Sequence, residues 1–494
     1  MAISFAATAL HKADPHAMSD TPALTYRPAF HFTPAAHWMN DPNGLVFHEG
    51  VYHLFFQYHP HSSVWGPMHW GHATSRDLVH WQEHPVALAP DELGMIFSGS
   101  AVLDLNNTSG LGLAGTSPLV ALFTHNSTTL ESQGQPHQRQ SLAYSLDAGQ
   151  TWHKHSGNPV LPSPGLKDFR DPKVFWHETT ARWIMSLACG DHIAFYSSPD
   201  LKEWTWESGF GHQSGAHGGV WECPDLIQLS LNGRARWVLL VSLTPGGPQG
   251  GSATQYFVGD FDGHSFTPEH TDVRWLDWGA DNYAGVTWSN TPGRCIFVGW
   301  MSSWLYAKDV PTTPWRGAMT LPRELSLRDV EGQAWLCSPV AREVEAAFKS
   351  EPMLVEASAV RGAAVQCWNV VDCTKPVKIR LRSAAAESWT VTVSNARGDR
   401  WQLAYDAQAR TFCVDRSSSG VVDFHPEFAA RHVAPRISQS DVCEVCVYMD
   451  AASMETIADG GLSSLTSVVF PRAPWCQVQT DGEVQITLYG PQSR

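Results

Sequence analysis

A turn built around an aspartate recurs four times in the chain, and this repeat limits the possible folds more than any other feature. The aspartates, Asp77, Asp147, Asp200 and Asp262, are 70, 53 and 62 residues apart. An aromatic residue follows each aspartate four or five positions later. Turns of one kind at such intervals are typical of a β-propeller, in which each small antiparallel sheet repeats the same connection.

The pattern of apolar residues supports an all-β chain. Before residue 335 helical periodicity is nearly absent, and short apolar runs alternate with glycine, proline, asparagine and aspartate. Val340, Val344 and Phe348 then recur at helical spacing and predict one short helix. After residue 351 the strand-like runs resume without the aspartate turn, which favours a β-sandwich. We therefore expect a flexible N-terminal extension (1–30), a β-propeller (31–330), a linker with a short helix (331–350) and a β-sandwich (351–494).

The charge of the chain narrows the partners that it can bind. There are 33 Lys and Arg against 48 Asp and Glu, which gives a formal net charge of -15. Such a chain lacks the basic surface that nucleic acids require and has little attraction for anionic membranes. Most of the 22 tryptophans suit packing between strands, and the rest suit stacking against the apolar faces of sugars. We expect a neutral oligo- or polysaccharide substrate, no nucleic acid and no membrane.

The first residues make a poor secretion signal. An apolar run covers residues 2–10, but no positive charge precedes it and no small-residue cleavage site follows it. Met18 is an alternative start. We therefore favour a cytoplasmic protein over a secreted one, and the sequence leaves the oligomeric state open.

The sequence predicts neither a metal site nor a cofactor. Cys443 and Cys446 form an isolated pair whose valine neighbours indicate a strand. No second cysteine pair or histidine lies nearby at zinc-ligand spacing.

Three carboxylates lie in short segments rich in proline, glycine and aromatic residues. Asp41 lies in WMNDPNG (38–44), Asp171 in FRDP (169–172) and Glu222 in WECPD (221–225). An Asp-Pro pair alone is common in turns. Because the strands of a propeller converge on its axis, however, three carboxylates at the ends of successive strand runs are expected to meet there.

The neighbours of each carboxylate suggest its role. Glycoside hydrolysis needs one ionised carboxylate to attack the anomeric carbon and one protonated group to assist the departing oxygen. Flanking asparagines can donate hydrogen bonds that keep Asp41 ionised, so Asp41 is the candidate nucleophile. The apolar neighbours of Glu222 favour its protonated form, so Glu222 is the candidate acid/base, with Asp225 as the next choice. Arg170 is expected to keep Asp171 ionised, as a stabiliser of positive charge in the transition state.

These segments, in this order, resemble glycoside hydrolase family 32, the family of invertases, inulinases and levanases. Further matching segments are FFQY (55–58), FSGS (97–100), DNYA (281–284) and GWM (299–301). The resemblance covers about residues 31 to 472. It implies a five-bladed β-propeller that carries the site, followed by a C-terminal β-sandwich. It also implies a retaining mechanism with the roles given above for Asp41, Glu222 and Asp171.

The resemblance further implies a subsite for the terminal fructosyl unit. By position in the matching segments, its lining residues are Asn40, Gln57, Trp65, Phe97, Ser98, Arg170, Tyr283 and Trp304. The nearby Trp300 is the alternative to Trp304 at this position of the subsite. The chain departs from the family pattern at DAAS (450–453), where the family has an arginine.

The sequence therefore predicts a retaining, exo-acting β-fructosidase that hydrolyses terminal β-D-fructofuranosyl residues of inulin or levan and of sucrose. A fructosyltransferase or a strict invertase would use the same covalent intermediate, so both stay as alternatives. An inactive fructan-binding protein is a distant alternative, because all three carboxylates are present. A propeller that serves as a platform for other proteins is weaker still, because the repeats differ in length.

Overall fold

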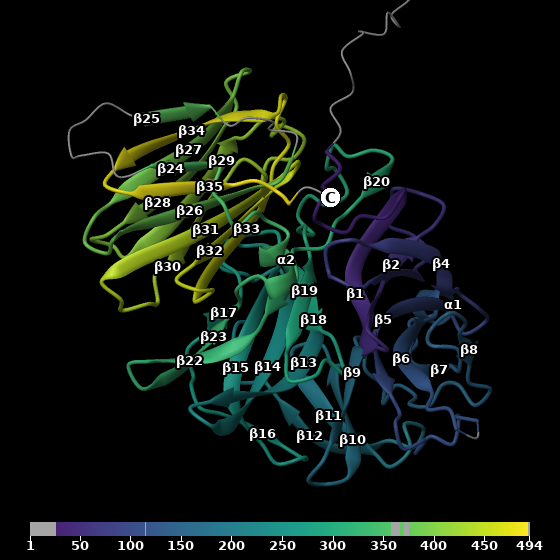
Figure 1. Ribbon diagram of the computed structural model, residues 1–494. Helices are drawn as coiled ribbons and strands as arrows, with labels where there is room; N and C mark the ends of the chain where they lie inside the picture. The colour runs from purple at the N-terminus through teal and green to yellow at the C-terminus, as the bar shows by residue number, and fades with distance from the viewer. Residues whose placement is uncertain (1–25, 114, 357–365, 370–374, 493–494) are drawn as a thin grey trace, which may run out of the picture.

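The computed structural model describes residues 26–113, 115–356, 366–369 and 375–492, which form two all-β bodies (Figure 1). Residues 1–25, most of the expected N-terminal extension, lie outside this description. Helices α1 (Thr128–Ser132) and α2 (Arg342–Ala346) have five residues each. Within the described ranges, no helix is long and apolar enough to cross a membrane.

The N-terminal body is a five-bladed β-propeller of antiparallel sheets. Its first blade contains β1 (His37–His48), β2 (Val51–His59), β3 (His69–Ser75) and β4 (Gln82–Leu88), and its second contains β5 (Met95–Leu103), β6 (Leu119–Asn126), β7 (Gln138–Ser145) and β8 (His153–Lys154). The third contains β9 (Arg170–His177), β10 (Arg182–Ala188), β11 (Ile193–Ser198) and β12 (Thr205–Phe210). The fourth contains β13 (Val220–Leu231), β14 (Arg234–Thr244), β15 (Ala253–Phe261), β16 (Phe266–Pro268) and β17 (Arg274–Trp275). The fifth contains β18 (Tyr283–Thr287), β19 (Ile296–Trp300) and β21 (Arg323–Glu324).

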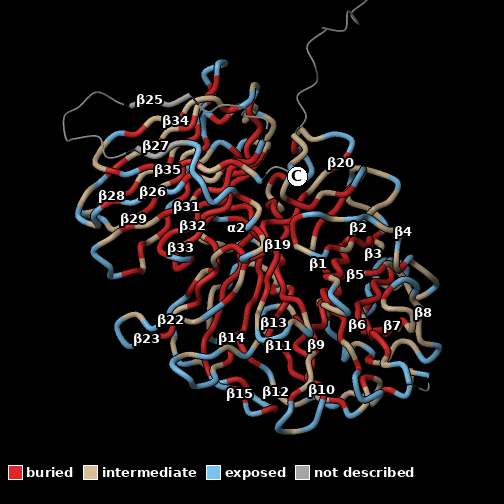
Figure 2. The backbone as a smooth tube through the Cα atoms, in the orientation of Figure 1, coloured by how far each residue is buried: buried red, intermediate tan, exposed pale blue. Residues whose placement is uncertain are grey.

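The innermost strands β1, β5, β9, β13 and β18 form a closed ring. Each contacts the next in this order, and β18 contacts β1. The Phe47 N–H donates to the Ser289 carbonyl and the Ser289 N–H donates to the Leu45 carbonyl, both at 3.0 Å. Strand β20 (Trp315–Arg316) also pairs with β1, in parallel. The last part of the propeller is therefore hydrogen-bonded to the first, and buried stretches concentrate in the strands (Figure 2).

The recurring aspartate turn has the same place in four blades, as the sequence predicts. Asp77, Asp147, Asp200 and Asp262 each follow the third strand of a blade and precede its outermost strand. Each carboxylate accepts backbone N–H groups of its own turn, as Asp200 does from residues 202 and 203 at 3.0 and 2.9 Å. An aspartate recurs here because its short side chain can satisfy the backbone of a tight turn.

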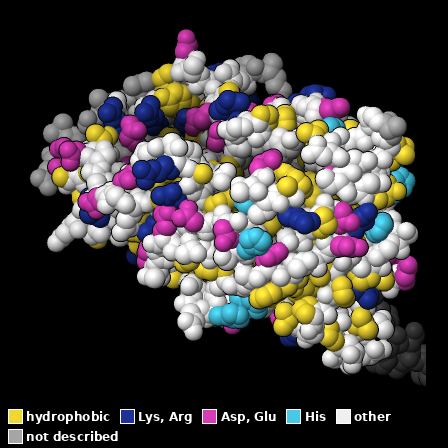
Figure 3. Space-filling view, turned by 90° about the horizontal axis from the view of Figure 1, so that it is seen from below, with side chains coloured by type: hydrophobic (Ala, Val, Ile, Leu, Met, Phe, Trp, Pro, Cys, Tyr) yellow, Lys and Arg dark blue, Asp and Glu magenta, His cyan; other side chains and the backbone are white. Residues whose placement is uncertain are grey.

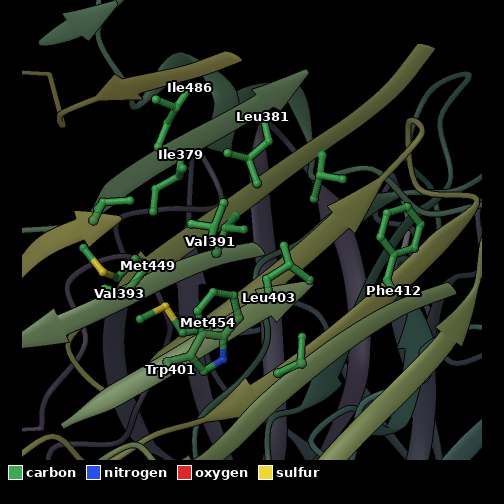
Figure 4. Packing of buried hydrophobic residues seen from close by; sticks show 14 of the residues in the cluster. Ile379, Leu381, Val391, Val393, Trp401, Leu403, Phe412, Met449, Met454 and Ile486 are labelled. Carbon is green, nitrogen blue, oxygen red and sulfur yellow. The ribbon is translucent and has the colours of Figure 1, made fainter. Parts of the chain in front are cut away.

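The C-terminal body is a sandwich of two six-stranded sheets. One has the order β24 (Leu354–Glu356), β35 (Gln485–Tyr489), β26 (Val377–Ala384), β31 (Val442–Asp450), β32 (Ser453–Ala458) and β33 (Ser463–Val468). The other has the order β25 (Gln366–Asn369), β34 (Trp475–Gly482), β27 (Trp389–Asn395), β28 (Arg400–Asp406), β29 (Thr411–Ser418) and β30 (Arg431–Pro435). Alternate residues of each sheet, such as Ile379 and Leu381 on β26 and Val391 on β27, fill the space between them (Figure 4).

Two elements link the bodies. The hairpin of β22 (Ser326–Val330) and β23 (Gln333–Cys337) packs Leu336 against the fourth blade. Helix α2 follows it, and Val340, Val344 and Phe348 lie together in a small core with Tyr448 of the sandwich. The predicted helical spacing is thus present, although the helix itself is one short turn.

Buried ion pairs hold the two bodies together. Arg416 of the sandwich contacts Asp281 of the propeller at 2.5 Å, and neither side chain is exposed. Arg323 of the propeller contacts Glu455 of the sandwich at 2.7 Å, again with no exposure. Breaking a buried pair by removing one partner leaves a buried charge without compensation, so these contacts fix the sandwich against the propeller.

Charges on the outer surface are mixed in sign. On the face shown in Figure 3, Lys and Arg side chains lie scattered among acidic and uncharged ones and form no continuous stripe.

Candidate active site

The innermost strands all lose their regular register at the same end of the propeller. The shifts fall between Met39 and Pro42 in β1, Ile96 and Gly99 in β5, Arg170 and Lys173 in β9, Glu222 and Asp225 in β13, and Tyr283 and Val286 in β18. A bulge leaves residues outside the ladder and re-aims their side chains. Asp41, Asp171 and Glu222 all lie in or at the edge of these bulges, near the start of their strands.

Three of the bulges contain a residue with left-handed backbone geometry that is not glycine. The φ angles are +64° at Asp171, +47° at Cys223 and +53° at Ala284. Such conformations are costly and persist where surrounding contacts enforce them. Here the contacts cross between blades, because the Cys223 N–H donates to Asp171 Oδ2 at 3.0 Å and the Asp171 N–H donates to Thr124 Oγ1 at 3.1 Å.

Asp41 is held by neutral donors. Ser98 Oγ donates to its Oδ2 at 2.7 Å, and Asn40 Nδ2 donates to its Oδ1 at 2.9 Å. Asn40 is oriented in turn by Trp38, whose indole N–H donates to the amide oxygen at 2.8 Å. Burial and the nearby Glu222 raise the pKa of Asp41, and the two donors act against this rise. The expected hydrogen bond from an asparagine is therefore present, but its effect on the pKa of Asp41 is smaller than that of burial.

Asp171 lies deeper than the other two carboxylates. The residue is 5% exposed. Burial raises its pKa to about 7, with Glu222 and Asp41 adding to the rise and Arg170 opposing it. Arg170 acts in the expected direction on Asp171 but does not outweigh burial, and its guanidinium lies 4.0 Å from Asp171 Oδ2 and makes its shorter contacts elsewhere.

Arg170 bonds to Glu222 instead. Its Nε and Nη2 donate to Glu222 Oε1 at 3.1 and 3.0 Å, and its Nη1 donates to Asp168 at 2.5 Å. The Tyr283 hydroxyl donates to the other oxygen of Glu222. The prediction that Glu222 has apolar surroundings is therefore wrong. Side chains alternate along a strand, so Trp221 points the other way, is fully buried and donates its indole N–H to the Ala216 carbonyl.

The Cys223 thiol lies between two of the carboxylates. Its Sγ is 3.7 Å from Asp41 Oδ2 and 3.6 Å from Asp171 Oδ2. The three carboxylates lie close enough for their charges to interact, because Glu222 raises the pKa of both Asp41 and Asp171, and Asp41 adds to the rise at Asp171. The sequence did not single out Cys223 or Thr124 as site residues, because their contacts come from other blades. It also did not single out Asp168, which contacts Arg170 two positions away.

Asp225, the second choice for the acid, is committed to a structural role. It is fully buried, and its Oδ2 accepts from the N–H and the hydroxyl of Thr287, both at 2.7 Å. Lys173 lies 3.1 Å from the same oxygen. This carboxylate ties the third, fourth and fifth blades together and has no solvent access.

The aromatic residues of the expected subsite line the same end of the propeller core. Trp65 and Phe97 are half-buried and meet edge to face, with ring centroids 6.3 Å apart. Trp304 is half-buried and stacks on Trp38, with ring centroids 5.9 Å apart. Trp300 is completely buried. Trp304 is therefore the tryptophan of the two with a face that a ligand can reach.

Gln57 reaches the site indirectly. It is buried on β2. In the Asn43 amide orientation that satisfies both of its ends, the oxygen accepts from Gln57 Nε2 at 3.0 Å and the nitrogen donates to Ser98 Oγ at 3.2 Å. Gln57 thereby connects through Asn43 to the serine that holds Asp41.

Comparison with known sequences decides the family. The N-terminal domain of glycosyl hydrolases family 32 matches residues 31–339, and the C-terminal domain of that family matches residues 344–488. The chain belongs to glycosyl hydrolase family 32. It is an enzyme of the glycoside hydrolase class, and the resemblance seen in the sequence is confirmed.

Relatives within family 32 agree along most of the chain. A levanase from Bacillus subtilis is 45% identical over 460 residues, which are 90% of this chain and 66% of that protein. An extracellular exo-inulinase from Aspergillus niger is 39% identical over 484 residues, 90% of each chain. The crystal structure of exo-inulinase from Aspergillus awamori superimposes with a TM-score of 0.88 at 36% identity and covers 96% of this chain and 99% of that one. A β-fructofuranosidase from Schwanniomyces occidentalis complexed with fructosyl-erythritol gives a TM-score of 0.85 at 31% identity, over 95% and 98% of the two chains.

The Asp171→Asn variant should be more stable than the wild type at alkaline pH. Folding raises the pKa of this carboxyl group from 3.8 to about 7. Between these values the folded protein keeps a proton that the unfolded chain has lost, so its contribution to stability falls as the pH rises towards 7. Asparagine has no charge to bury. We expect Tm to exceed the wild-type value by roughly 2–4 °C at pH 8, with the difference shrinking towards pH 5.

Scanning calorimetry at both pH values measures this difference. Asp423→Asn, at an exposed position, is the control and should match the wild type throughout. A Tm difference for Asp171→Asn that is the same at pH 5 and pH 8 would contradict the assigned burial cost.

Proposed function

We propose that this family 32 enzyme is a retaining, exo-acting β-fructosidase that hydrolyses terminal β-D-fructofuranosyl residues of fructans and of sucrose. In this proposal Asp41 is the nucleophile, Glu222 the acid/base and Asp171 the stabiliser of the transition state. The observation that carries it is the meeting of three carboxylates in unlike surroundings around Cys223. The names of the relatives, levanase, exo-inulinase and β-fructofuranosidase, support the substrate class.

The surroundings of Asp41 suit a nucleophile. Ser98 and Asn40 hold its two oxygens with hydrogen bonds, and neither of these donors carries a positive charge that would neutralise the attacking carboxylate. Burial has removed part of its water shell, which makes the ionised group more reactive. In the first step one oxygen of Asp41 forms a bond to the anomeric carbon of the fructosyl unit as the bond to the leaving oxygen breaks.

The surroundings of Glu222 suit a group that loses and regains a proton. Its side chain is 21% exposed, against 6% for Asp171, so it can reach a leaving group and later a water molecule. Arg170 and the Tyr283 hydroxyl stabilise the carboxylate that forms when the proton is given away. Glu222 can then take a proton from the water that attacks the covalent intermediate, which restores the enzyme.

Asp171 contributes most when positive charge develops on the sugar ring. Burial disfavours its ionised form in the free enzyme. A neighbouring oxocarbenium-like charge compensates that cost, so the interaction strengthens in the transition state more than in the ground state. This difference is what accelerates a reaction, and it gives Asp171 a role without a covalent bond.

Fructosyl transfer and strict sucrose cleavage share this first step. Strict sucrose cleavage differs from fructan hydrolysis in the group that leaves, and fructosyl transfer differs in the molecule that attacks the intermediate. The contacts of Asp41, Asp171 and Glu222 favour neither alternative. Hydrolysis of fructans is preferred because the levanase and the exo-inulinases match 90% of this chain.

The products formed from inulin, levan and sucrose test the proposed function. An exo-acting enzyme releases fructose as the first product from both polymers, whereas an internal cut would give oligosaccharides first. We expect fructose in each reaction, and a loss of at least ~10³-fold in turnover for a folded Asp41→Asn variant. Early oligosaccharides from inulin and levan, or no release from any of the three substrates, would overturn the proposal.

Glu222→Ala should show a loss that depends on the leaving group. A sugar alkoxide needs a proton to depart, whereas a nitrophenolate leaves almost unaided. We expect a loss on the order of 10²–10⁴-fold on sucrose and inulin, and a much smaller loss in the fructosylation step with an aryl fructoside. Asp171→Ala is the matched comparison and should lose activity on both substrate types, because charge stabilisation is needed whatever leaves.

Pre-steady-state burst kinetics separate fructosylation from hydrolysis of the intermediate in this experiment. Equal losses of Glu222→Ala on natural and aryl substrates in the fructosylation step would exclude Glu222 as the acid.

A further inference from the structure

Two histidines and an aspartate meet on the rim of the third blade. Asp191 and His192 lie on the turn between β10 and β11, and His212 follows β12. The Nδ1 atoms of His192 and His212 are 3.2 and 3.6 Å from Asp191 Oδ1. The two imidazole rings are tilted by 30° with centroids 4.0 Å apart. Elsewhere in the described ranges, no other group of three His, Cys, Asp or Glu residues offers ligand atoms this close together.

These separations match those between the ligands of a bound cation, although the 3.2 Å contact of His192 with Asp191 is also a hydrogen bond. Bonds of about 2.0–2.2 Å to a tetrahedral ion place two ligand atoms about 3.4 Å apart. Both measured separations from Asp191 Oδ1 lie within 0.2 Å of that value. Two imidazoles and one carboxylate are ligands that Zn²⁺ and its neighbours prefer. An ion here would complete its coordination with water.

Two of the three ligands are accessible to solvent, and the third packs against the backbone of a strand. The side chains of Asp191 and His212 are 64% and 63% exposed, so an ion can enter from solvent. The side chain of His192 is 18% exposed, and it lies close to the backbone of Gly209 on β12. One half-buried and two exposed ligands describe a site that is partly preformed and open to exchange.

Both ligand-bearing segments contact the residue that precedes Glu222. The Gly190 carbonyl, next to Asp191, accepts the Trp221 N–H at 2.7 Å. Gly211, next to His212, lies so close to the Trp221 ring that a Cβ there would come within 2.3 Å of it. An ion bound by the three ligands would therefore fix the β10–β11 turn and the β12–β13 connection on either side of Trp221.

We propose that Asp191, His192 and His212 bind one divalent cation of the Zn²⁺ class at the rim of the active-site end. The ion plays no part in the carboxylate chemistry, and the site does not depend on the proposed function. Its effect is to cross-link two segments that flank the strand start of Glu222. The sequence concealed this site because His212 is twenty positions away from His192.

Calorimetric titration of the EDTA-dialysed protein with ZnCl₂ at pH 7 tests this site directly. We expect one binding event per chain that weakens at least ~10-fold in His212→Ala and in Asp191→Asn. The control is His264→Ala, which removes an exposed histidine that also contacts a carboxylate, Glu207, at 2.7 Å. Its affinity for Zn²⁺ should equal that of the wild type.

Two further readouts keep the test specific. Co²⁺ in place of Zn²⁺ should give visible absorption bands that His212→Ala abolishes. Zn²⁺ at about 100 times its Kd should raise Tm by a few degrees in the wild type and in His264→Ala, but not in His212→Ala or Asp191→Asn. Absence of binding to the wild type would overturn the proposal. Binding, spectra and Tm shifts that persist unchanged in His212→Ala and Asp191→Asn would overturn it equally.

Discussion

The active site depends on one geometric constraint, the bulge that each innermost strand makes where the five strands start. A regular strand alternates its side chains between two faces, and a ring of such strands would place a single layer of residues at the axis. The bulges at Asp41, Asp171 and Glu222, together with those in β5 and β18, break this alternation at one level of all five blades. The left-handed backbone at Asp171 and Cys223 shows that the chain accepts local strain to do so.

The same convergence brings carboxylates close together, and their mutual repulsion and burial lower the stability of the folded protein. Three carboxylates share a partly dehydrated space, which raises the pKa of Asp41 and Asp171. Arg170 hydrogen-bonds Glu222 and lies 4.0 Å from Asp171, where it opposes the rise in the Asp171 pKa without outweighing burial. Burying these ionisable groups costs stability, and the same burial leaves the groups reactive. Buried ion pairs such as that between Arg416 and Asp281 hold the sandwich on the propeller and keep the fifth blade in place.

The sequence predicted the fold and named carboxylates that the structure brings close together, but it did not predict the environment of each carboxylate. The aspartate turn can be predicted from the sequence because its contacts are local: each carboxylate accepts hydrogen bonds from the backbone of its own turn. The surroundings of Glu222 were misjudged because neighbours in sequence lie on opposite faces of a strand. Its real partner, Arg170, comes from another blade 52 positions away. The sequence placed Trp304 rather than Trp300 in the subsite by its position in the matching segments, and in the structure Trp304 is half-buried whereas Trp300 is fully buried.

A trapped intermediate tests the central assignment most directly. Glu222→Ala treated with an aryl fructoside should accumulate a fructosyl ester, because the first step no longer needs the acid and the second lacks its base. Rapid acid quenching, peptic digestion and mass spectrometry locate the added fructosyl unit. We expect it on the peptide that contains Asp41, as an ester of that carboxylate. A fructosyl unit on the peptide that contains Asp171, or a burst of aryl alcohol with no labelled peptide, would contradict this account.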